Sequence, residues 1–369
     1  MVLAGQFQVE AKLMNILVLG AGYIGEAIAH DLSKNFELTI ADIDEEDLKK
    51  VERYGDTIKV DASDYEEVKE AMKGFDLVVE CLPGKFGYQT LEAAIEAGKD
   101  IVSVSFMPED PLQLDEKAKD AGVTIIPDAG FGPGLPNVCL SIMNDTFDDF
   151  QEVLIHIAGL PLDPQPPLYY RITWSPENLI DEYKREARIV KDGEITSVDP
   201  LKEIKDTEIK DLELEAFLSD GLRTLLTTLD VPDIEEWTMR WEGHLDKIKT
   251  LRELGFFKEE NLENTIDVIT PHMKYYSKDF CIMQVKGKGT IDGEEKEVKY
   301  DLYDEEKDDF TSMARTTGFT TAIVAKLLAE GEFGSGVIPP ECLDRETCET
   351  VLSEVKERDI SIEKSQRSL

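Results

Sequence analysis

The chain has 369 residues, of which 41% are hydrophobic and 32% charged, so it is long enough for two packed domains and too mixed for a fibrous protein. Its 40 basic and 78 acidic residues give a formal net charge of −38, which argues against nucleic acid or an acidic membrane as a partner. No run approaches the roughly 18–20 apolar residues of a membrane helix, and the first thirteen residues, which we interpret as a short extension, do not resemble a signal peptide. We therefore expect a cytoplasmic protein that acts on a small molecule.

Short apolar runs rich in β-branched residues recur through the first third of the chain. They begin near Asn15, Glu37, Thr57, Asp76, Asp100 and Val123. The intervals between them have apolar residues at helical spacing, and four intervals close with a glycine, at Gly55, Gly74, Gly98 and Gly122. Strands alternating with helices predict an α/β fold with a parallel sheet covered on both faces, and six such strands are typical of a doubly wound Rossmann domain.

Beyond Gly134 the pattern changes to that of a second, α+β domain. Strands are predicted within the runs EVLIHIAGLP, LYYRITW and EWTMRW, and Asp-Gly pairs at 192–193 and 292–293 predict two antiparallel hairpins. Helices are predicted over 221–228, 244–254 and 316–330, and the polar tail after Val355 is predicted to fray.

The segment GAGYIG, at residues 20–25, follows the first predicted strand and opens a helix. Gly20 permits a tight turn, Gly22 lets the backbone approach a pyrophosphate, and Gly25 lets the helix pack closely on the strand. Tyr23 and Ile24 complete the loop, and the free N–H groups of the helix N-terminus favour phosphate. The segment therefore predicts a dinucleotide-binding site.

Three further strand ends are expected to complete the cofactor site. Asp42, followed by Ile43, ends the second strand, where a carboxylate can accept hydrogen bonds from both ribose hydroxyls and repel a 2′-phosphate, which favours NAD over NADP. The other predicted contacts are Asp61 and Ala62 near the adenine, and Cys81, Leu82 and Pro83 near the pyrophosphate and nicotinamide ribose. Cys81 is interpreted as a small packing residue and not as a nucleophile.

The cysteines and histidines give no sign of a metal site. The five cysteines are widely spread without a C-x-x-C pair, and none of the four histidines stands at metal-ligand spacing from one of them. We expect reduced, mostly buried thiols and no bound metal.

Several longer motifs point to a known family. The segments VSVSFMPE, TIIPDAGFGPGLPN, GLPLDPQPPLYYRITWSPENLIDEY, LEAFLSDGLRT and MRWEGH, together with GAGYIG, resemble the saccharopine dehydrogenase-like oxidoreductases, and among them most of all the L-lysine 6-dehydrogenases. The resemblance covers about residues 14–340. It implies NAD-dependent oxidative deamination of the lysine side chain and a homodimer or larger homo-oligomer. It also implies that the C-terminal helix returns to the nucleotide domain, giving domains of 14–134 plus about 311–350, and 135–310 for the substrate and dimerisation domain.

The expected catalytic residues are Asp128 and His244. Asp128 ends the sixth strand, where ligands bind in such sheets, although a turn carboxylate is an equal alternative. His244 is the one histidine within a family-like motif, and its alternative is a buried structural histidine. The residues considered for gripping a substrate carboxylate or lining its pocket are Arg240, Arg223, Arg315, Arg171, Tyr170 and Trp174.

Two alternatives to lysine deamination stay open. A saccharopine-type or carboxynorspermidine-type dehydrogenase would share the fold and hydride chemistry but fill the pocket differently, and the saccharopine type needs more cationic groups for a second dicarboxylate. A non-catalytic NAD-binding sensor is the alternative from another class, against which the polar motifs SDGLRT, RWEGH and MARTTGF argue.

Overall fold

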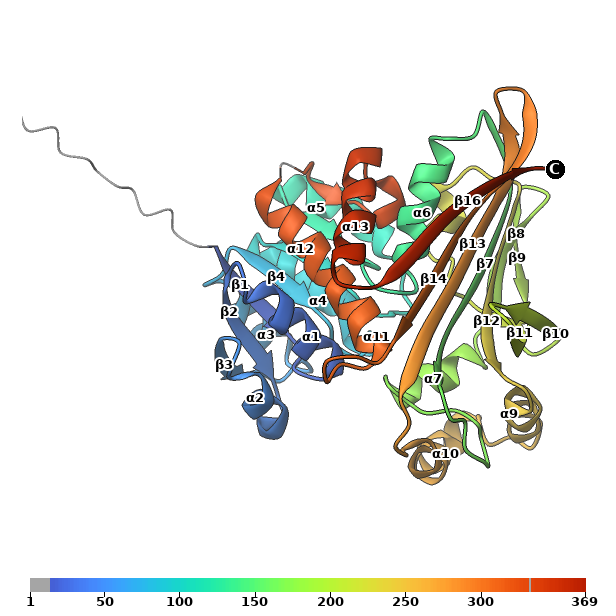
Figure 1. Ribbon diagram of the computed structural model, residues 1–369. Helices are drawn as coiled ribbons and strands as arrows, with labels where there is room; N and C mark the ends of the chain where they lie inside the picture. The colour runs from blue at the N-terminus through green and yellow to red at the C-terminus, as the bar shows by residue number, and fades with distance from the viewer. Residues whose placement is uncertain (1–13, 332) are drawn as a thin grey trace, which may run out of the picture.

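The computed structural model describes residues 14–331 and 333–369, which form two domains packed side by side (Figure 1). The extension before Met14 lies outside the described residues. In the first domain seven strands form an all-parallel sheet in the order β15 (Gly336–Val337), β6 (Thr124–Ile126), β5 (Asp100–Ser103), β4 (Leu77–Glu80), β1 (Asn15–Leu19), β2 (Glu37–Asp42), β3 (Asp56–Lys59). The order reverses between β1 and β4, as in a Rossmann sheet, so the predicted fold class is confirmed.

Helices cover both faces of this sheet, because its strands are apolar on both sides. One face is covered by α3 (Tyr65–Met72), α4 (Gly84–Ala97) and α5 (Asp115–Ala121). The other carries α1 (Tyr23–Leu32), α2 (Glu45–Val51) and α12 (Thr320–Glu330), with α6 (Leu135–Asn144) and α13 (Arg345–Glu357) behind them. Of the four glycines predicted to close helical intervals, Gly98 and Gly122 adopt the left-handed conformation of a helix C-cap.

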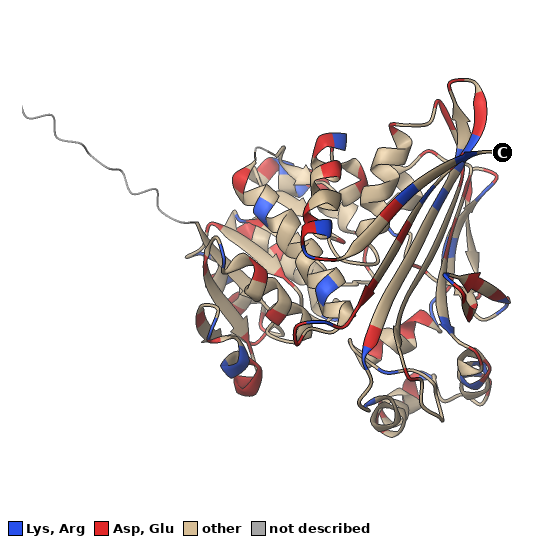
Figure 2. Ribbon diagram, in the orientation of Figure 1, with Lys and Arg blue, Asp and Glu red and all other residues tan. Residues whose placement is uncertain are grey.

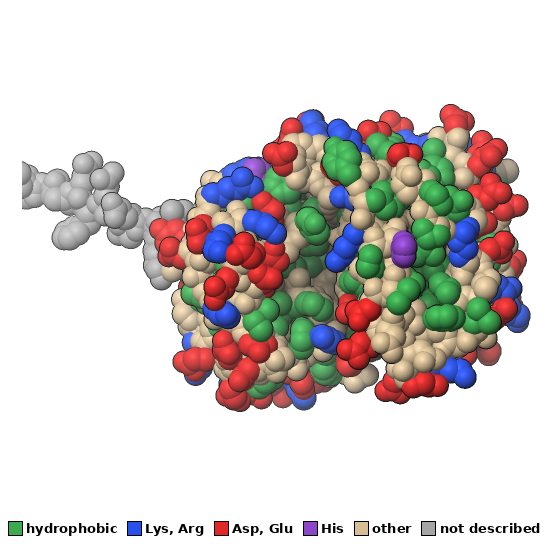
Figure 3. Space-filling model, turned by 90° about the horizontal axis from the view of Figure 1, so that it is seen from below, with side chains coloured by type: hydrophobic (Ala, Val, Ile, Leu, Met, Phe, Trp, Pro, Cys, Tyr) green, Lys and Arg blue, Asp and Glu red, His purple; other side chains and the backbone are tan. Residues whose placement is uncertain are grey.

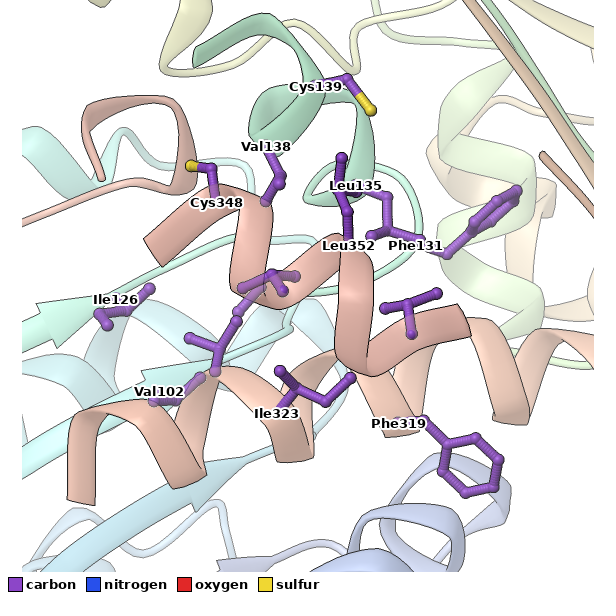
Figure 4. Close-up of a cluster of buried hydrophobic side chains, with 14 of the residues drawn as sticks. Val102, Ile126, Phe131, Leu135, Val138, Cys139, Phe319, Ile323, Cys348 and Leu352 are labelled. Atoms are coloured by element: carbon purple, nitrogen blue, oxygen red, sulfur yellow. The ribbon is translucent and has the colours of Figure 1, made fainter. Parts of the chain in front are cut away.

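The C-terminal helix lies against the nucleotide-binding sheet. The chain passes through α11 (Ser312–Ala314) and a π-helical turn, η3 (Arg315–Phe319), before α12. A Cβ atom at Gly318 would lie 2.7 Å from the Cβ of Ala27, so this glycine lets η3 approach α1 closely. Side chains of α12, α13, α6 and the sheet meet in one hydrophobic core that continues into the second domain (Figure 4).

The second domain is built on a nine-stranded mixed sheet. Along its main path the order is β10 (Ile204–Ile209), β11 (Leu212–Leu218), β12 (Asp233–Trp241), β7 (Asp149–Pro161), β13 (Asp279–Ile291), β14 (Glu294–Glu305), β16 (Ser361–Ser368), while β8 (Ala187–Lys191) pairs with β12 and with β9 (Glu194–Val198). The outer face is covered by α7 (Pro176–Glu182), α9 (His244–Glu253) and α10 (Glu259–Ile269). Both predicted Asp-Gly hairpins are present, between β8 and β9 and between β13 and β14.

Three sequence predictions for this domain are wrong. Residues 168–174 form no strand, because the three prolines of 164–167 remove backbone donors and Tyr169 turns the chain with a positive φ. The predicted helix over 221–228 is reduced to α8 (Leu225–Thr228). The tail does not fray: β16 pairs along the edge of β14 and buries Ile362. Short 3₁₀ helices complete the fold, η1 (Pro111–Leu114), η2 (Thr270–Met273) and η4 (Pro340–Cys342).

Charged side chains are spread over both domains, with acidic residues in the majority, as the net charge requires (Figure 2). Among residues 14–331 and 333–369, no helix has the length and apolar character needed to cross a lipid bilayer. The same part of the chain contains no group of three or more His, Cys, Asp or Glu side chains arranged to hold a metal ion.

Candidate active site

A cavity of about 730 Å³ opens between the two domains, at the carboxyl ends of the parallel strands. The loops after β1, β2, β3 and β4 form one wall, and β7, β12 and η3 contribute to the other. Seen from below, the surface is hollowed between the two lobes (Figure 3). All twelve residues predicted to contact the cofactor line this cavity: Gly20, Gly22, Tyr23, Ile24, Gly25, Asp42, Ile43, Asp61, Ala62, Cys81, Leu82 and Pro83.

The glycines of the first loop have different structural roles. Gly20 has a φ of +110°, and a Cβ atom at Gly25 would lie 2.0 Å from the carbonyl oxygen of Gly20, so the fold itself requires both glycines. A Cβ atom at Gly22 would meet nothing within 4 Å. The open space beside Gly22 lies at the N-terminus of α1, where backbone N–H groups favour a phosphate. The loop therefore fits the pyrophosphate of a dinucleotide.

Asp42 is fixed at the cavity rim by the backbone. Its Oδ2 accepts the Ala21 N–H at 2.7 Å and its Oδ1 accepts the Asp44 N–H at 2.9 Å. Each carboxylate oxygen keeps a further lone pair for a ribose hydroxyl. Asp47 and Asp61 line the same end of the cavity, where no lysine or arginine is among the described lining residues.

Buried polar groups hold the loop after β4. The Glu80 carboxyl accepts hydrogen bonds from the hydroxyls of Ser103 and Ser105 and from the Leu82 N–H, and burial raises its pKa. Burial, then the nearby carboxyls of Glu80 and Asp42, also raise the pKa of the Cys81 thiol well above its usual value. Such a thiol stays protonated and suits packing better than nucleophilic attack.

The far end of the cavity belongs to the second domain and contains its charged groups. Strand β12 alternates, so that Glu236, Thr238 and Arg240 line the cavity. Glu182, at the end of α7, also lines it and accepts a hydrogen bond from Arg240 Nη2 at 2.7 Å. Arg240 is the one lysine or arginine among the described lining residues, and Glu182 neutralises it.

Glu236 has no such cationic partner. Its Oε1 accepts a hydrogen bond from Ser219 Oγ at 2.9 Å, and Ser219 in turn accepts one from Thr238 Oγ1 at 2.7 Å. Burial, opposed by the Ser219 hydrogen bond and reinforced by Glu182 and Asp220, raises the pKa of Glu236 to about 8. The side chain is therefore a mostly protonated carboxyl at neutral pH.

His244, a predicted catalytic residue, is fully buried and does not line the cavity. Its Nδ1 lies 2.6 Å from the Leu168 carbonyl oxygen, which can only accept, so Nδ1 donates and Nε2 accepts from the Tyr183 hydroxyl at 2.9 Å. Burial, then the nearby Arg240, lower the pKa of His244 to about 3, which keeps the ring neutral. Tyr183 also accepts a hydrogen bond from Arg240 Nε, so the Tyr183 hydroxyl links His244 to Arg240. His244 itself has no contact with the cavity.

Asp128 and Arg223, predicted for catalysis and for substrate binding, are brought together as a buried ion pair. The Arg223 Nε donates to both carboxylate oxygens of Asp128, at 2.8 and 2.9 Å, and neither residue lines the cavity. Burial raises the pKa of Asp128, and Arg223 opposes that shift. Arg223 and Arg185 both lie over the ring of Phe106, and Phe106 lines the cavity. The Nη2 groups of both arginines are buried without a hydrogen-bond partner among the described residues.

Two other arginines predicted to bind substrate, Arg315 and Arg171, form ion pairs with carboxylates of the second domain. Arg315 forms a buried ion pair with Asp304 at 3.1 Å, and Arg171 lies 3.3 Å from Glu306. Neither lines the cavity. Tyr170 and Trp174 do line it, and the Trp174 indole N–H donates to the Tyr170 hydroxyl at 2.9 Å.

Two family models match nearly the whole chain. The saccharopine dehydrogenase NADP binding domain matches residues 16–126, and the saccharopine dehydrogenase C-terminal domain matches residues 130–360. The chain belongs to the saccharopine dehydrogenase family. The resemblance stated from the sequence is thus confirmed for the family, while its closeness to the lysine 6-dehydrogenases stays a prediction.

Curated members of the saccharopine dehydrogenase family share about a quarter of their aligned residues with this chain. The saccharopine dehydrogenase [NADP(+), L-glutamate-forming] of Pyricularia oryzae is 24% identical over 269 residues, which cover 67% of this chain and 58% of the relative. The α-aminoadipic semialdehyde synthase of Arabidopsis thaliana is 27% identical over 227 residues, covering 56% of this chain and 21% of the plant protein. The chain therefore spans about three fifths or less of these two relatives.

A solved structure shows the same fold throughout. The apo saccharopine dehydrogenase (L-Glu forming) of Saccharomyces cerevisiae superposes with a TM-score of 0.80 at 19% identity, covering 96% of this chain and all of that one. Both domains and their arrangement are thus those of the family.

Sequence reasoning missed Glu182, Glu236 and Arg185. The alternation of polar and apolar residues in EEWTMRW carried a signal for Glu236, since it places Glu236 on the same face as Arg240. Nothing in the sequence showed that this face is buried at a cavity.

Proposed function

We propose that this member of the saccharopine dehydrogenase family catalyses NAD-dependent oxidative deamination of the side-chain amine of L-lysine. The observation that carries the proposal is the shortage of cationic partners for the carboxyl groups of the cavity. Its substrate end holds two carboxyls, Glu182 and Glu236, against a single guanidinium, that of Arg240. Such a site favours a ligand that brings positive charge, as an amine does.

NAD is the proposed cofactor, although the fungal relatives carry NADP in their names. Asp42, with Asp47 and Asp61 at the same end, would repel a 2′-phosphate, and the first basic residue after Asp42, Lys49, pairs with Glu46 instead. The open space at Gly22 and the N-terminus of α1 fit the pyrophosphate. When bound, the nicotinamide supplies the hydride acceptor.

The chain's own residues must bind and deprotonate the substrate. Lysine has one α-carboxylate, which we place near Phe106, where Arg185 and Arg223 each keep a buried donor without a partner among the described residues. Its side-chain ammonium has a pKa of about 10.4, so at pH 7 the reactive amine is scarce by a factor of about 10³·⁴. After proton and hydride loss, water adds to the iminium, ammonia leaves, and the resulting semialdehyde cyclises to a piperideine carboxylate.

The saccharopine-type reaction is the second candidate, favoured by the names of the relatives. Saccharopine carries three carboxylates. The only basic residue among the described lining residues is Arg240, which Glu182 already neutralises, so the cavity has no free cationic group for the additional carboxylates. A carboxynorspermidine-type substrate has less negative charge and suits the cavity better than saccharopine does. The sensor alternative and the homo-oligomeric state expected from the resemblance stay predictions.

A spectrophotometric screen tests the proposal. The enzyme is incubated with NAD or NADP and with lysine, saccharopine, ornithine or carboxynorspermidine, and reduced cofactor is followed at 340 nm. We expect the highest kcat/KM with lysine and NAD. Faster turnover of saccharopine with NADP would replace the proposal with the second candidate, and no turnover of any substrate would favour the sensor.

A further inference from the structure

Glu236 is a buried carboxyl without a counter-ion at the wall of the cavity. The residue is 5% exposed, and no lysine or arginine of the described chain lies within ion-pair distance of it. Its Oε1 accepts one hydrogen bond, from Ser219, and its Oε2 accepts none from the described residues. An acceptor atom at a cavity wall is thus left free for a ligand.

The other buried glutamates among the described residues have partners within the protein. Glu80 accepts from two serine hydroxyls and a backbone N–H, and Glu341 accepts from Asn137 and Thr228. Glu297 pairs with Arg367, and the half-buried Glu182 pairs with Arg240. Because burying a carboxyl with unused acceptor capacity costs stability, the exception at Glu236 points to a function.

The fold also reserves space for this side chain. A Cβ atom at Gly221 would lie 1.8 Å from Glu236 Oε1, so the carboxyl packs directly over the glycine backbone. Ser219, two residues earlier, supplies the hydrogen bond that holds Oε1, and Thr238 holds Ser219. The carboxyl is therefore fixed from one side, with Oε2 left without a bond from the described residues.

We propose that Glu236 is a catalytic residue: its carboxylate binds the substrate's side-chain ammonium and accepts the proton that must leave before hydride transfer. The inference rests on the proposed function, which supplies the amine and the hydride acceptor. Glu182, beside Arg240, would add to the negative potential that attracts the ammonium.

The proton balance of the step can be written out. Near pH 7 the free site holds a neutral Glu236 carboxyl, and the arriving ammonium displaces its proton to solvent, because the ion pair favours the carboxylate. The carboxylate then takes one proton from the ammonium. The lone pair so freed forms the C=N bond as the carbon gives its hydride to the nicotinamide; the carbon is oxidised by two electrons and the nicotinamide is reduced by two.

The groups around Glu236 set this exchange. Glu182 on α7 and Asp220 after β11 disfavour the charged carboxylate, the Ser219 hydrogen bond favours it, and Arg240 on the same strand is already paired with Glu182. A cationic ligand adds the missing positive charge. Release of a proton on binding is therefore the signature of the proposal.

Calorimetry on the complex with NADH tests it without turnover, because NADH cannot accept a hydride. L-lysine is titrated at pH 7 in buffers of different ionisation enthalpy, which gives the number of protons released. We expect close to one proton per lysine for the wild type, and none for Glu236→Gln, with lysine binding weakened at least tenfold. Glu235→Gln is the matched control: the neighbouring side chain accepts from Trp237 Nε1 and does not line the cavity, so proton release should persist.

Activity and a second variant complete the test. Glu236→Gln should slow the turnover of lysine with NAD by about 10²–10⁴-fold, the usual scale for a lost base, while NADH affinity is retained. Ser219→Ala leaves the carboxyl but removes its donor, so proton release should persist to higher pH than in the wild type.

The outcomes separate this proposal from the proposed function. If the wild type oxidises lysine but Glu236→Gln keeps its proton release and turnover, the role of Glu236 is overturned and the function stands. If the wild type releases a Glu236-dependent proton on binding ornithine or carboxynorspermidine but never oxidises lysine, the lysine assignment is overturned and the role of Glu236 stands.

Discussion

Replacing Asp42 with Asn tests how the cavity selects its dinucleotide. Both carboxylate oxygens accept a backbone N–H, at 2.7 and 2.9 Å, so an amide must turn its NH₂ group toward one of these donors. That loss affects the free and the bound enzyme alike and should lower the free energy of unfolding by about 0.5–1.5 kcal/mol. The change in cofactor affinity then isolates the ribose contacts.

The expected change in affinity has opposite sign for the two cofactors. Losing the charge and one acceptor for a ribose hydroxyl should cost NAD about 1.5–3 kcal/mol, which is roughly 10- to 100-fold in Kd. A 2′-phosphate carries up to two negative charges, each repelled by about 1 kcal/mol at 4 Å in water, so NADP should gain up to about 2 kcal/mol. The preference for NAD should therefore fall by roughly 100-fold or more.

Titration of both reduced cofactors by nucleotide fluorescence gives the two dissociation constants. Asp44→Asn is the matched control, because it also removes one negative charge and lies two residues after Asp42. The Asp44 side chain caps α2 and does not line the cavity. It should leave the ratio of the two constants nearly unchanged. An unchanged ratio in Asp42→Asn would refute the assignment of Asp42 to the ribose.

Three further substitutions have outcomes that the geometry fixes. Gly22→Ala should leave the melting temperature of the free enzyme nearly unchanged, because its Cβ meets nothing within 4 Å, yet weaken NADH binding at least tenfold; equal binding would show that the space is not the pyrophosphate site. Asp128→Ala should lower the free energy of unfolding, measured by chemical denaturation, by about 3–5 kcal/mol, because it leaves the buried Arg223 without its counter-ion. The double variant Asp128→Ala with Arg223→Met should recover part of that loss, whereas additive losses would contradict a coupled pair. His244→Gln should lower the free energy of unfolding. The His244 pKa is about 3 in the folded protein and 6.5 in the unfolded chain, so the wild type should gain stability as pH rises from about 3 to 6.5. The His244→Gln variant should lack the gain in stability that comes from His244. If this variant instead turned over about 10²–10⁴-fold more slowly, with an altered pH–rate profile, His244 would be the acid–base group after all.

The nucleotide domain was predictable because its signals are local. Each strand is an apolar run, each helix has one apolar face, and the glycine loop follows a strand directly, so neighbouring residues decide the outcome. The Asp-Gly hairpins were predictable for the same reason, since Asp292 and Gly293 adopt the positive φ values that such a turn needs.

The errors arose where tertiary contacts decide. Strand β16 is polar at most positions and gains its order by pairing with the edge of β14, which its own composition does not announce. Asp128 and Arg223 stand 95 residues apart, so the ion pair that turns the Asp128 carboxylate toward Arg223 exists only in the folded chain. A polar face on β12 is the normal sign of a solvent-facing strand, whereas here Glu236, Thr238 and Arg240 are buried and line the cavity.

The most direct test of the account follows the hydride itself. The enzyme is given NAD and L-lysine carrying two deuterium atoms on the side-chain carbon next to the amine, and the NADH formed is analysed by mass spectrometry. The account predicts one deuterium in each NADH and a piperideine carboxylate as the product. NADH without deuterium, or reduced cofactor formed from saccharopine and not from lysine, would contradict it.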